Sequence, residues 1–375
     1  MRFCGYVLLM LMPFLAVSCN NAETQKKADN NGKGRFTIIT FPSYKKIIVT
    51  DPWQGSRAVK FEYYLFHESV QVPDSLKSRV IIRTPVRRII CMSTTHLPMI
   101  YALGSGDAIV GISGRSLIYN PDLRKRLEEG SVKDVGYETS LDKELIVSLK
   151  PDLLMAYGVN PASAGYMNKL GELGVKVMFD ADYLEQDPLK RAEWIKVFGA
   201  LFEKSDIADS IFNQVTVSYN NLRDSVLMCR EKKPVVLLGG PWENSWYVAT
   251  ADTYVTRLLR DAGAKYLFED LRAEHAVPYS VEKVYSKASA ADVWLNPGSA
   301  RSLEELYGFD YRLRNLQVCK AGEVYSFNKR VTAEGGNDYW ESAVIRPDLV
   351  LRDMVSVFHP DLLPGYKMQY CRKLE

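Results

Sequence analysis

Alternating apolar and polar residues near the start of the chain predict a small β segment over residues 36–85. Four runs, 36–40, 46–50, 61–66 and 79–83, are rich in β-branched and aromatic residues, and turn pairs such as Asp51-Pro52 lie between them. Alternation of this kind between turn residues is typical of half-buried strands. We therefore expect these runs to form a sheet ahead of the main fold.

From residue 86 the pattern changes to repeated units of a short apolar run, a loop and an amphipathic stretch. The apolar runs predict strands at 88–92, 108–112, 152–156 and 175–179, and the amphipathic stretches predict helices at 97–103, at 141–149 and before Gly174. Repeated strand–helix units are typical of a mainly parallel sheet covered by helices. Residues 86–186 are thus predicted to form an N-terminal α/β lobe.

A long helical pattern follows this lobe. No Gly or Pro interrupts residues 205–230, so the helix would run for about 39 Å at 1.5 Å per residue. A stiff rod of this length is a candidate connector, and we expect residues 187–231 to form a connecting helix region. Apolar residues recur on one face of the rod at steps of three and four: Ile207, Ile211, Val215, Tyr219, Leu222 and Val226.

The strand–helix units resume after Pro234 and predict a C-terminal α/β lobe over residues 232–375. Its strands are expected at 235–238, 292–295 and 323–327, and its helices at 253–262, 280–288 and 347–357. The predicted fold class is therefore α/β, with two Rossmann-like lobes bridged by a single long α-helix and preceded by the small β segment.

The N-terminus has the layout of an exported lipoprotein. Arg2 is followed by an apolar run over residues 6–17, too short to span a bilayer comfortably, that ends in Leu15-Ala16-Val17-Ser18-Cys19. We predict a signal peptide over 1–18, lipidation at Cys19 and a flexible tether over 19–35, with the protein held on a bacterial membrane and facing the periplasm. A plain signal peptide cut nearby is the alternative.

Composition narrows the possible partners. Among 375 residues, 48 Lys and Arg stand against 45 Asp and Glu, so no basic excess supports dedicated nucleic-acid binding. The 22 Tyr, 14 Phe and 6 Trp are enough to line a large ligand cleft as well as to fill cores. Four cysteines beyond the tether contain no C-x-x-C pair, which leaves disulfide formation open: Cys91, Cys229, Cys319 and Cys371.

Three runs of sequence carry a resemblance to a known family: Arg88-Ile-Ile-Cys-Met-Ser-Thr-Thr-His96, Tyr101-Ala-Leu-Gly-Ser-Gly-Asp-Ala-Ile-Val-Gly111, and Val135-Gly-Tyr through Leu149-Lys-Pro-Asp-Leu-Leu154. Their order and spacing resemble the substrate-binding proteins of bacterial ABC importers for metal chelates, namely ferric siderophores, haem and cobalamin. The resemblance covers about residue 86 to the C-terminus. It implies a ligand bound between two lobes and delivered to a membrane permease with its cytoplasmic ATPase, without catalysis and without a cofactor of its own.

Loops that follow the predicted strands supply the candidate ligand-binding residues, because ligands of open α/β sheets bind beyond the carboxyl ends of the strands. Aromatic faces suit a flat macrocycle or catecholate rings, and Arg suits a carboxylate or an anionic chelate. Lobe packing of the aromatic residues and surface ion pairs of Arg115 and Arg301 are the alternatives. The candidates are Thr95, His96, Arg115, Tyr157, Trp242, Trp246, Arg301, Arg330, Asn337, Tyr339 and Trp340.

The resemblance also implies one acidic docking residue on each lobe for basic pockets of the permease. The matching positions are Glu144 in the N-terminal lobe and Glu282 in the C-terminal lobe. Each could equally be a solvated carboxylate on a helix face. Charge pairs of this sort steer association more than they add affinity.

Three other functions remain open at the level of sequence. A receptor for free zinc or manganese would use His and carboxylate ligands, but His67, His96, His275 and His359 are scattered. An enzyme finds no positive support, because Gly104-Ser-Gly106 follows a helix rather than a strand and no nucleophile elbow or phosphate-binding loop is present. A lipoprotein that only sequesters a chelate is the third, and the identity of the chelate is not determined.

Overall fold

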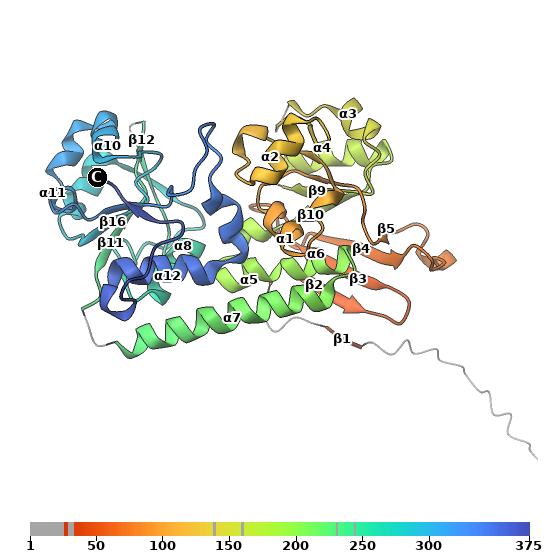
Figure 1. The fold of residues 1–375 in the computed structure, drawn as a ribbon, viewed down its shortest axis with the longest axis horizontal. Helices are drawn as coiled ribbons and strands as arrows, with labels where there is room; N and C mark the ends of the chain where they lie inside the picture. The colour runs from red at the N-terminus through yellow and green to blue at the C-terminus, as the bar shows by residue number, and fades with distance from the viewer. Residues whose placement is uncertain (1–25, 29–33, 138–139, 159–160, 230–231, 244) are drawn as a thin grey trace, which may run out of the picture.

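The computed structural model describes residues 26–28, 34–137, 140–158, 161–229, 232–243 and 245–375. They form two α/β lobes and an N-terminal sheet, and the long helix α7 (Ser205–Met228) runs beneath both lobes (Figure 1). The predicted signal peptide over 1–18, the lipidation site Cys19 and most of the tether lie outside the described residues.

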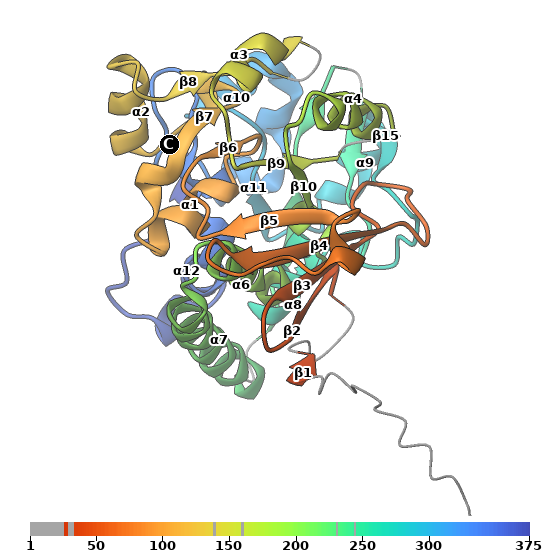
Figure 2. The ribbon, with the colours of Figure 1, turned by 90° about the vertical axis from the view of Figure 1, so that its right-hand side faces the viewer.

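The N-terminal sheet packs on the N-terminal lobe and shares its core. Phe36, Ile47 and Tyr63 of the sheet are buried in the same cluster as Ile89 of the lobe and Trp194 between α5 and α6. Figure 2 shows the strands of this sheet below β9 and β10 of the lobe. Neighbouring strands are antiparallel except β4 and β5, which are parallel. In spatial order the strands are β1 (Lys26–Ala28), β2 (Phe36–Thr40), β3 (Lys45–Thr50), β4 (Lys60–His67) and β5 (Val80–Thr84).

A parallel sheet forms the centre of the N-terminal lobe, with the order β10-β9-β6-β7-β8. The central strands are buried along almost their whole length, as is usual where helices cover a parallel sheet. The strands are β6 (Ile89–Cys91), β7 (Ile109–Ile112), β8 (Lys133–Asp134), β9 (Leu153–Tyr157) and β10 (Val177–Asp180). The helices are α1 (His96–Ala102), α2 (Pro121–Glu128), α3 (Lys143–Ser148) and α4 (Pro161–Glu172).

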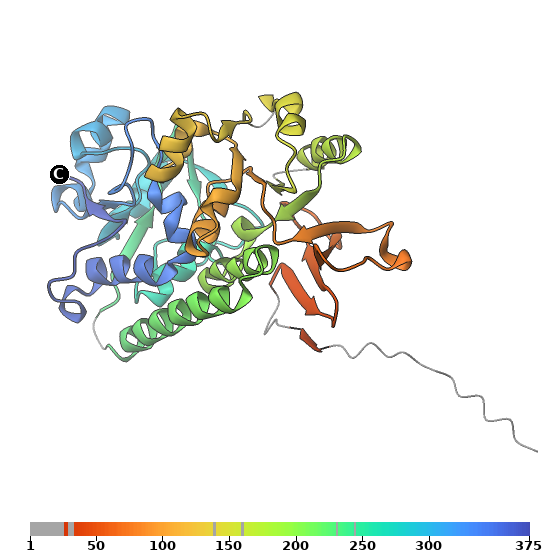
Figure 3. The ribbon, with the colours of Figure 1, turned by 45° about the vertical axis from the view of Figure 1, so that its right-hand side comes forward.

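Three helices connect the lobes: α5 (Pro188–Glu193), α6 (Ile195–Leu201) and α7. Ala208 near the start of α7 belongs to the core of the N-terminal lobe, whereas Tyr219 and Val226 belong to the core of the C-terminal lobe. With 24 residues the helix is about 36 Å long, and it spans both lobes (Figure 3). The predicted connecting helix is confirmed, although it ends two residues early and Ile207, expected on the buried face, is 48% exposed.

The C-terminal lobe has a main sheet in the order β14-β11-β16-β17-β18, parallel except for its last strand, and a small antiparallel sheet β12-β13-β15. The main strands are β11 (Val235–Leu238), β14 (Lys265–Tyr266), β16 (Val293–Leu295), β17 (Val324–Ser326) and β18 (Arg372–Lys373). The small sheet contains β12 (Pro241–Trp242), β13 (Ser245–Val248) and β15 (Val277–Ser280). The helices are α8 (Tyr254–Asp261), α9 (Val281–Ala288), α10 (Leu303–Phe309), α11 (Gln317–Lys320) and α12 (Pro347–Phe358).

A second connection between the lobes comes from a segment late in the chain. The 3₁₀ helices η7 (Asp338–Trp340) and η8 (Ser342–Ile345) lie between β17 and α12. Val344 and Ile345 pack in the core of the N-terminal lobe, although they lie in the stretch predicted to form the C-terminal lobe. The lobes are therefore joined both by α7 and by this cross-lobe segment, residues 328–345.

The predicted fold class is confirmed, and each predicted main-sheet strand matches an observed strand to within about two residues. The unpredicted strands are mostly short, such as β8, β14 and β18, because two-residue pairings leave little pattern in the sequence. In the part of the chain that the structure describes, no helix combines the length and apolar character needed to cross a membrane.

Candidate ligand-binding cleft

A cavity of about 900 Å³ lies between the two lobes. Its N-terminal wall includes residues 183–186, which follow β10 closely, and its C-terminal wall includes Gly239, Asn296 and Phe327, which directly follow β11, β16 and β17. The carboxyl ends of β10 in one lobe and of β11, β16 and β17 in the other therefore face the same space, which is the usual position of a ligand in open α/β sheets.

Aromatic side chains dominate the lining of this cavity. Tyr339 stacks on Phe327 with ring centroids 4.4 Å apart, and Trp340 meets Tyr339 edge-on at 4.8 Å. Trp340 remains 53% exposed, so its face is available to a ligand. The aromatic residues that line the cavity are Tyr183, Tyr247, Tyr254, Phe327, Tyr339 and Trp340.

Arg191 on α5 brings a buried positive charge to the cavity. Its Nε donates to Asp182 Oδ2 at 3.0 Å, and its guanidinium lies 5.3 Å from the centroid of the Tyr254 ring. Among the described residues the structure gives its two terminal nitrogens no hydrogen-bond partner. Arg191 is thus fixed at one nitrogen, and its other donors are left for a ligand.

A buried polar cluster lies behind Arg191. Asp182 also accepts a hydrogen bond from Thr95 Oγ1 at 3.2 Å, and its backbone N–H donates to Asp180 Oδ1 at 2.6 Å. His96 and Asp180 have no exposed surface, and His96 Nε2 lies 3.6 Å from Asp180 Oδ2. Burial lowers the pKa of His96 to about 4, while burial and the neighbouring charge of Asp182 raise the pKa of Asp180. At neutral pH we therefore expect His96 to be uncharged, so its contact with Asp180 is not an ion pair.

The cross-lobe segment closes one end of the cleft. Thr94 Oγ1 of the N-terminal lobe donates to the backbone oxygen of Trp340 at 3.0 Å. The Glu341 carboxylate accepts the backbone N–H groups of Tyr119 and Asn120 at 2.8 and 3.0 Å. Burial raises the pKa of Glu341 to about 7, even though these two hydrogen bonds act in the opposite direction.

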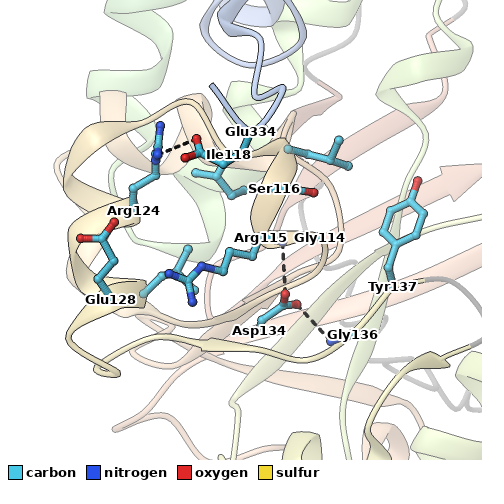
Figure 4. Close-up of a pocket in the computed structure, with 12 residues that line it drawn as sticks. Gly114, Arg115, Ser116, Ile118, Arg124, Glu128, Asp134, Gly136, Tyr137 and Glu334 are labelled. Atoms are coloured by element: carbon cyan, nitrogen blue, oxygen red, sulfur yellow. Dashed lines mark hydrogen bonds and ion pairs between the residues drawn. The ribbon is translucent and has the colours of Figure 1, made fainter. Parts of the chain in front are cut away.

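A second cavity of about 600 Å³ lies where the N-terminal lobe meets the cross-lobe segment (Figure 4). Arg115, Asp134 and Tyr137 line it from the N-terminal lobe. Arg124 of that lobe pairs with Glu334 of the cross-lobe segment at 2.7 Å. The predicted residue Arg115 therefore lies at the boundary between the lobes, but in a different cavity from Trp340.

The profile of the periplasmic binding protein family matches residues 89–315, more than half of the chain. This chain belongs to the periplasmic binding protein family. The resemblance noted in the sequence is confirmed at that level.

This periplasmic binding protein is 26% identical over 349 residues to an uncharacterized lipoprotein of Methanocaldococcus jannaschii, a match that covers 87% of the chain and 81% of the relative. It is 25% identical over 200 residues to an uncharacterized ABC transporter substrate-binding lipoprotein of Bacillus subtilis, which covers 52% of the chain and 60% of the relative. The solved structure of a periplasmic heme binding protein from Pseudomonas aeruginosa superposes with a TM-score of 0.58 at 19% identity, covering 77% of this chain and 98% of the other. The structural likeness supports the fold.

The remaining predicted ligand residues of the periplasmic binding protein lie in varied surroundings. Thr95, His96 and Trp246 are buried, and Trp246 in β13 packs beside Trp294 and donates its indole N–H to the Leu238 oxygen. Trp242 is 69% exposed on β12, and Arg301 is exposed near α10; neither lines the large cavity.

Two further predicted residues contact residues that line the large cavity, and a third lies nearby in the cross-lobe segment. Tyr157 meets the lining residue Tyr183 edge-on at 6.4 Å. Asn337 donates its side-chain N–H to the Phe327 oxygen at 3.0 Å. Arg330 pairs with Asp338 at 3.0 Å and lies over the Tyr119 ring. The structure thus brings together Tyr157, Arg330, Asn337, Tyr339 and Trp340 around the cleft.

The two predicted docking residues lie in the first turns of surface helices. Glu144 on α3 is exposed and has no ion pair with any described residue. Glu282 on α9 is also exposed, but it pairs with Arg312 at 2.9 Å. Hydrogen bonds from its own backbone and from Arg312 lower the pKa of Glu282, so it carries a negative charge at neutral pH.

Sequence reasoning missed Arg191, Tyr183, Tyr247 and Tyr254. Tyr183 could have been found, because it lies four residues after the predicted strand 175–179. Arg191 lies in the stretch that was assigned to the connector, and only the packing of α5 against both lobes turns it toward the cleft. No group of three or more His, Cys, Asp or Glu side chains suited to a metal ion occurs among the described residues.

Proposed function

We propose that this periplasmic binding protein captures a metal chelate, such as a ferric siderophore, haem or cobalamin, in the cavity between its lobes. The observation that carries the proposal is a cavity of about 900 Å³ lined by six aromatic side chains and one buried Arg. This volume lies at the upper end of the usual range for small-molecule sites. Aromatic faces offer large flat contacts to a macrocycle or to catecholate rings.

The charges around the cavity favour a ligand that carries anionic groups. Asp252 lies near Arg260 and Arg272, and Glu274 lies near Arg57, so these acidic lining residues have basic neighbours. The two terminal nitrogens of Arg191 have no hydrogen-bond partner among the described residues. A carboxylate or phosphate group of the chelate would satisfy them with charge-assisted hydrogen bonds.

Delivery to an ABC permease and its ATPase is the second part of the proposal. Membership of the periplasmic binding protein family and a relative named as an ABC transporter substrate-binding lipoprotein support it. In this account Glu144 and Glu282 dock on the permease, and a lipid on Cys19 holds the exported protein at the membrane. Membrane fractionation of the wild type and a Cys19→Ser variant tests the anchor, because only the wild type should remain with the membrane.

Titration with cyanocobalamin, haemin and several ferric siderophores, followed by thermal shift, tests the ligand class. A bound chelate at about 100 times its Kd should stabilise the folded protein by roughly 2.7 kcal/mol. No response to any of them would contradict the chelate assignment. Stoichiometric zinc in protein purified without chelators would favour a receptor for free metal instead.

A further inference from the structure

The loop between β3 and β4, residues 51–59, is firmly attached to the N-terminal lobe. Arg35 Nη1 donates to the Asp51 oxygen at 2.8 Å, while the backbone N–H of Arg35 donates to Glu185 Oε1 at 2.8 Å. Asp51 Oδ1 accepts the Val59 N–H at 3.0 Å and so closes the base of the loop. Arg35 thereby ties this loop to the segment that lines the ligand cavity.

Aromatic packing holds the middle of the same loop. Trp53 meets Phe179 of β10 edge-on at 5.8 Å and Phe61 of β4 at 6.0 Å. Gly158 lies so close that a Cβ there would be 3.2 Å from Trp53 Cβ. The backbone of the N-terminal lobe thus approaches Trp53 closely, and the loop follows the edge of the cleft.

The tip of the loop reaches across to the opposite lobe. Gln54 Nε2 lies 2.7 Å from Nδ1 of His275 and donates to it when Nδ1 carries no proton. Arg57 lies 3.7 Å from Glu274. Gln54, Glu274 and His275 all line the 900 Å³ cavity, so these two contacts join its walls at the rim.

We propose that the β3–β4 loop is a third wall of the ligand cavity, that Gln54 contacts the bound ligand, and that the contacts to His275 and Glu274 restrict the size of ligand that can enter. The inference rests on the proposed role of this cavity as the ligand site. It gives a function to the N-terminal sheet, which lies outside the 89–315 region matched by the family profile.

The two contacts suit a wall that opens. Gln54, Arg57, Glu274 and His275 are all exposed, so water replaces their interactions at little cost when they separate. In contrast, the base of the loop is held by the bonds of Arg35 and its middle by the packing of Trp53. We therefore expect the tip to move while the base stays in place.

The labelling rate of a cysteine placed inside the cavity measures how far the loop restricts entry, and this test needs no ligand. Ala249, half-buried in the cavity lining, is changed to Cys, and its labelling rates by N-ethylmaleimide and by the bulkier fluorescein maleimide are compared. The same chain without Ala249→Cys gives the background from native thiols. Adding Gln54→Ala and Arg57→Ala should raise the labelling rate with the bulky reagent roughly fivefold. A change of this size is expected because the form in which the loop contacts the opposite lobe loses about one exposed hydrogen bond. The rate with the small reagent should change less.

The matched control is Arg124→Ala, which removes the Arg124–Glu334 pair that joins the lobes at the second cavity. This control should leave both labelling rates unchanged. Equal rates in the wild type and the loop variant would overturn the proposal. An equal rise in the control would also overturn it, because the effect would then report general loosening of the lobes.

A second measurement addresses contact with the ligand, using haemin and cyanocobalamin as probes. Gln54→Ala should weaken binding of a probe that binds the wild type and speed the association of the larger cobalamin more than that of haemin. If the affinity and the association rate of a probe that binds the wild type are both unchanged in Gln54→Ala, Gln54 does not contact the ligand. If neither probe binds the wild type, haemin and cyanocobalamin are not ligands of this protein. The labelling rates alone then show whether the β3–β4 loop forms a wall of the cavity.

Discussion

Arg191 shows how a buried charge can be kept ready for a ligand. Its ion pair with Asp182 uses one nitrogen, and the Tyr254 ring supports the guanidinium plane. Truncating one partner of a buried ion pair is strongly destabilising because the other charge remains unpaired. A test of Arg191 must therefore remove both charges together.

The double variant Asp182→Asn/Arg191→Met is expected to bind haemin about 10- to 100-fold more weakly than the wild type, the range that corresponds to one lost hydrogen bond between charged groups. Tryptophan fluorescence titration measures the affinity, and urea unfolding confirms that the variant is folded. Arg301→Met serves as the control, because Arg301 is exposed and does not line the large cavity. A comparable loss in the control would assign the anion contact to Arg301 instead.

Glu341 makes stability depend on pH at the junction of the lobes. Burial raises its pKa from 4.5 to about 7, so the folded protein holds this proton more tightly than the unfolded chain does. The stabilising contribution is complete below about pH 4.5 and is lost as the pH rises toward 7. A pKa difference of this size corresponds to on the order of 3 kcal/mol.

We expect the free energy of unfolding of the wild type to fall between pH 5 and pH 8 relative to that of Glu341→Gln, which resembles the protonated carboxyl group and does not titrate. Urea unfolding at several pH values measures the difference. Parallel pH profiles for the two proteins would show that Glu341 does not titrate in this range.

At the scale of elements, close contact between α6 and α7 depends on a glycine. A Cβ at Gly199 of α6 would lie 2.6 Å from the Cβ of Ala208 on α7, in the core of the N-terminal lobe. The long helix can therefore lie directly against α6 only where no side chain intervenes. This contact fixes the start of the connector relative to the N-terminal lobe.

Gly199→Val is expected to destabilise the protein by about 1–3 kcal/mol, the usual effect of overpacking a core. The matched control is Gly171→Ala on α4, where a Cβ would meet no atom within 4 Å. Because Ala is a better helix former than Gly, the control should gain about 0.5–1 kcal/mol. Equal unfolding midpoints for Gly199→Val and the wild type in urea would show that α6 and α7 can separate freely.

The secondary structure was predictable wherever a pattern extended over several residues. The longer strands of both main sheets and the 24-residue helix left clear apolar runs or a clear helical period, whereas the two-residue strands β8, β14 and β18 did not. Trp246 illustrates the limit of this approach. Because it follows the predicted strand 235–238, Trp246 was expected in a loop. Its side chain is instead buried and packs against Trp294 from another strand. A local pattern carries no information about such a partner.

At the scale of the whole molecule, the lobes are held together by α7, by the cross-lobe segment and by contacts at the rim of the cavity. Connections at several places favour limited closure around a ligand rather than wide opening. Surfaces on both lobes then keep a nearly constant spacing, which suits the permease docking proposed above. Glu144 and Glu282 are each exposed on their own lobe.

The double variant Glu144→Lys/Glu282→Lys is expected to abolish uptake of the chelate while leaving its affinity unchanged, because reversed charges oppose docking on basic pockets. Uptake in cells and titration of the purified protein are measured together. Glu129→Lys/Glu304→Lys makes the same change of charge at other exposed positions and should support normal uptake. Lost affinity with uptake retained would remove the docking role.

The sequence by itself determined the α/β class, the two lobes, the long connecting helix and the family, because these features depend on local hydrophobic periodicity and on the order of short motifs. It also indicated Tyr339 and Trp340, which line the cavity. Only the tertiary structure decided that Arg191 lines the cavity between the lobes, that His96 does not, and that Gln54 meets His275 across 221 residues. Burial and long-range contacts arise when distant segments pack together, and no spacing within one segment specifies them.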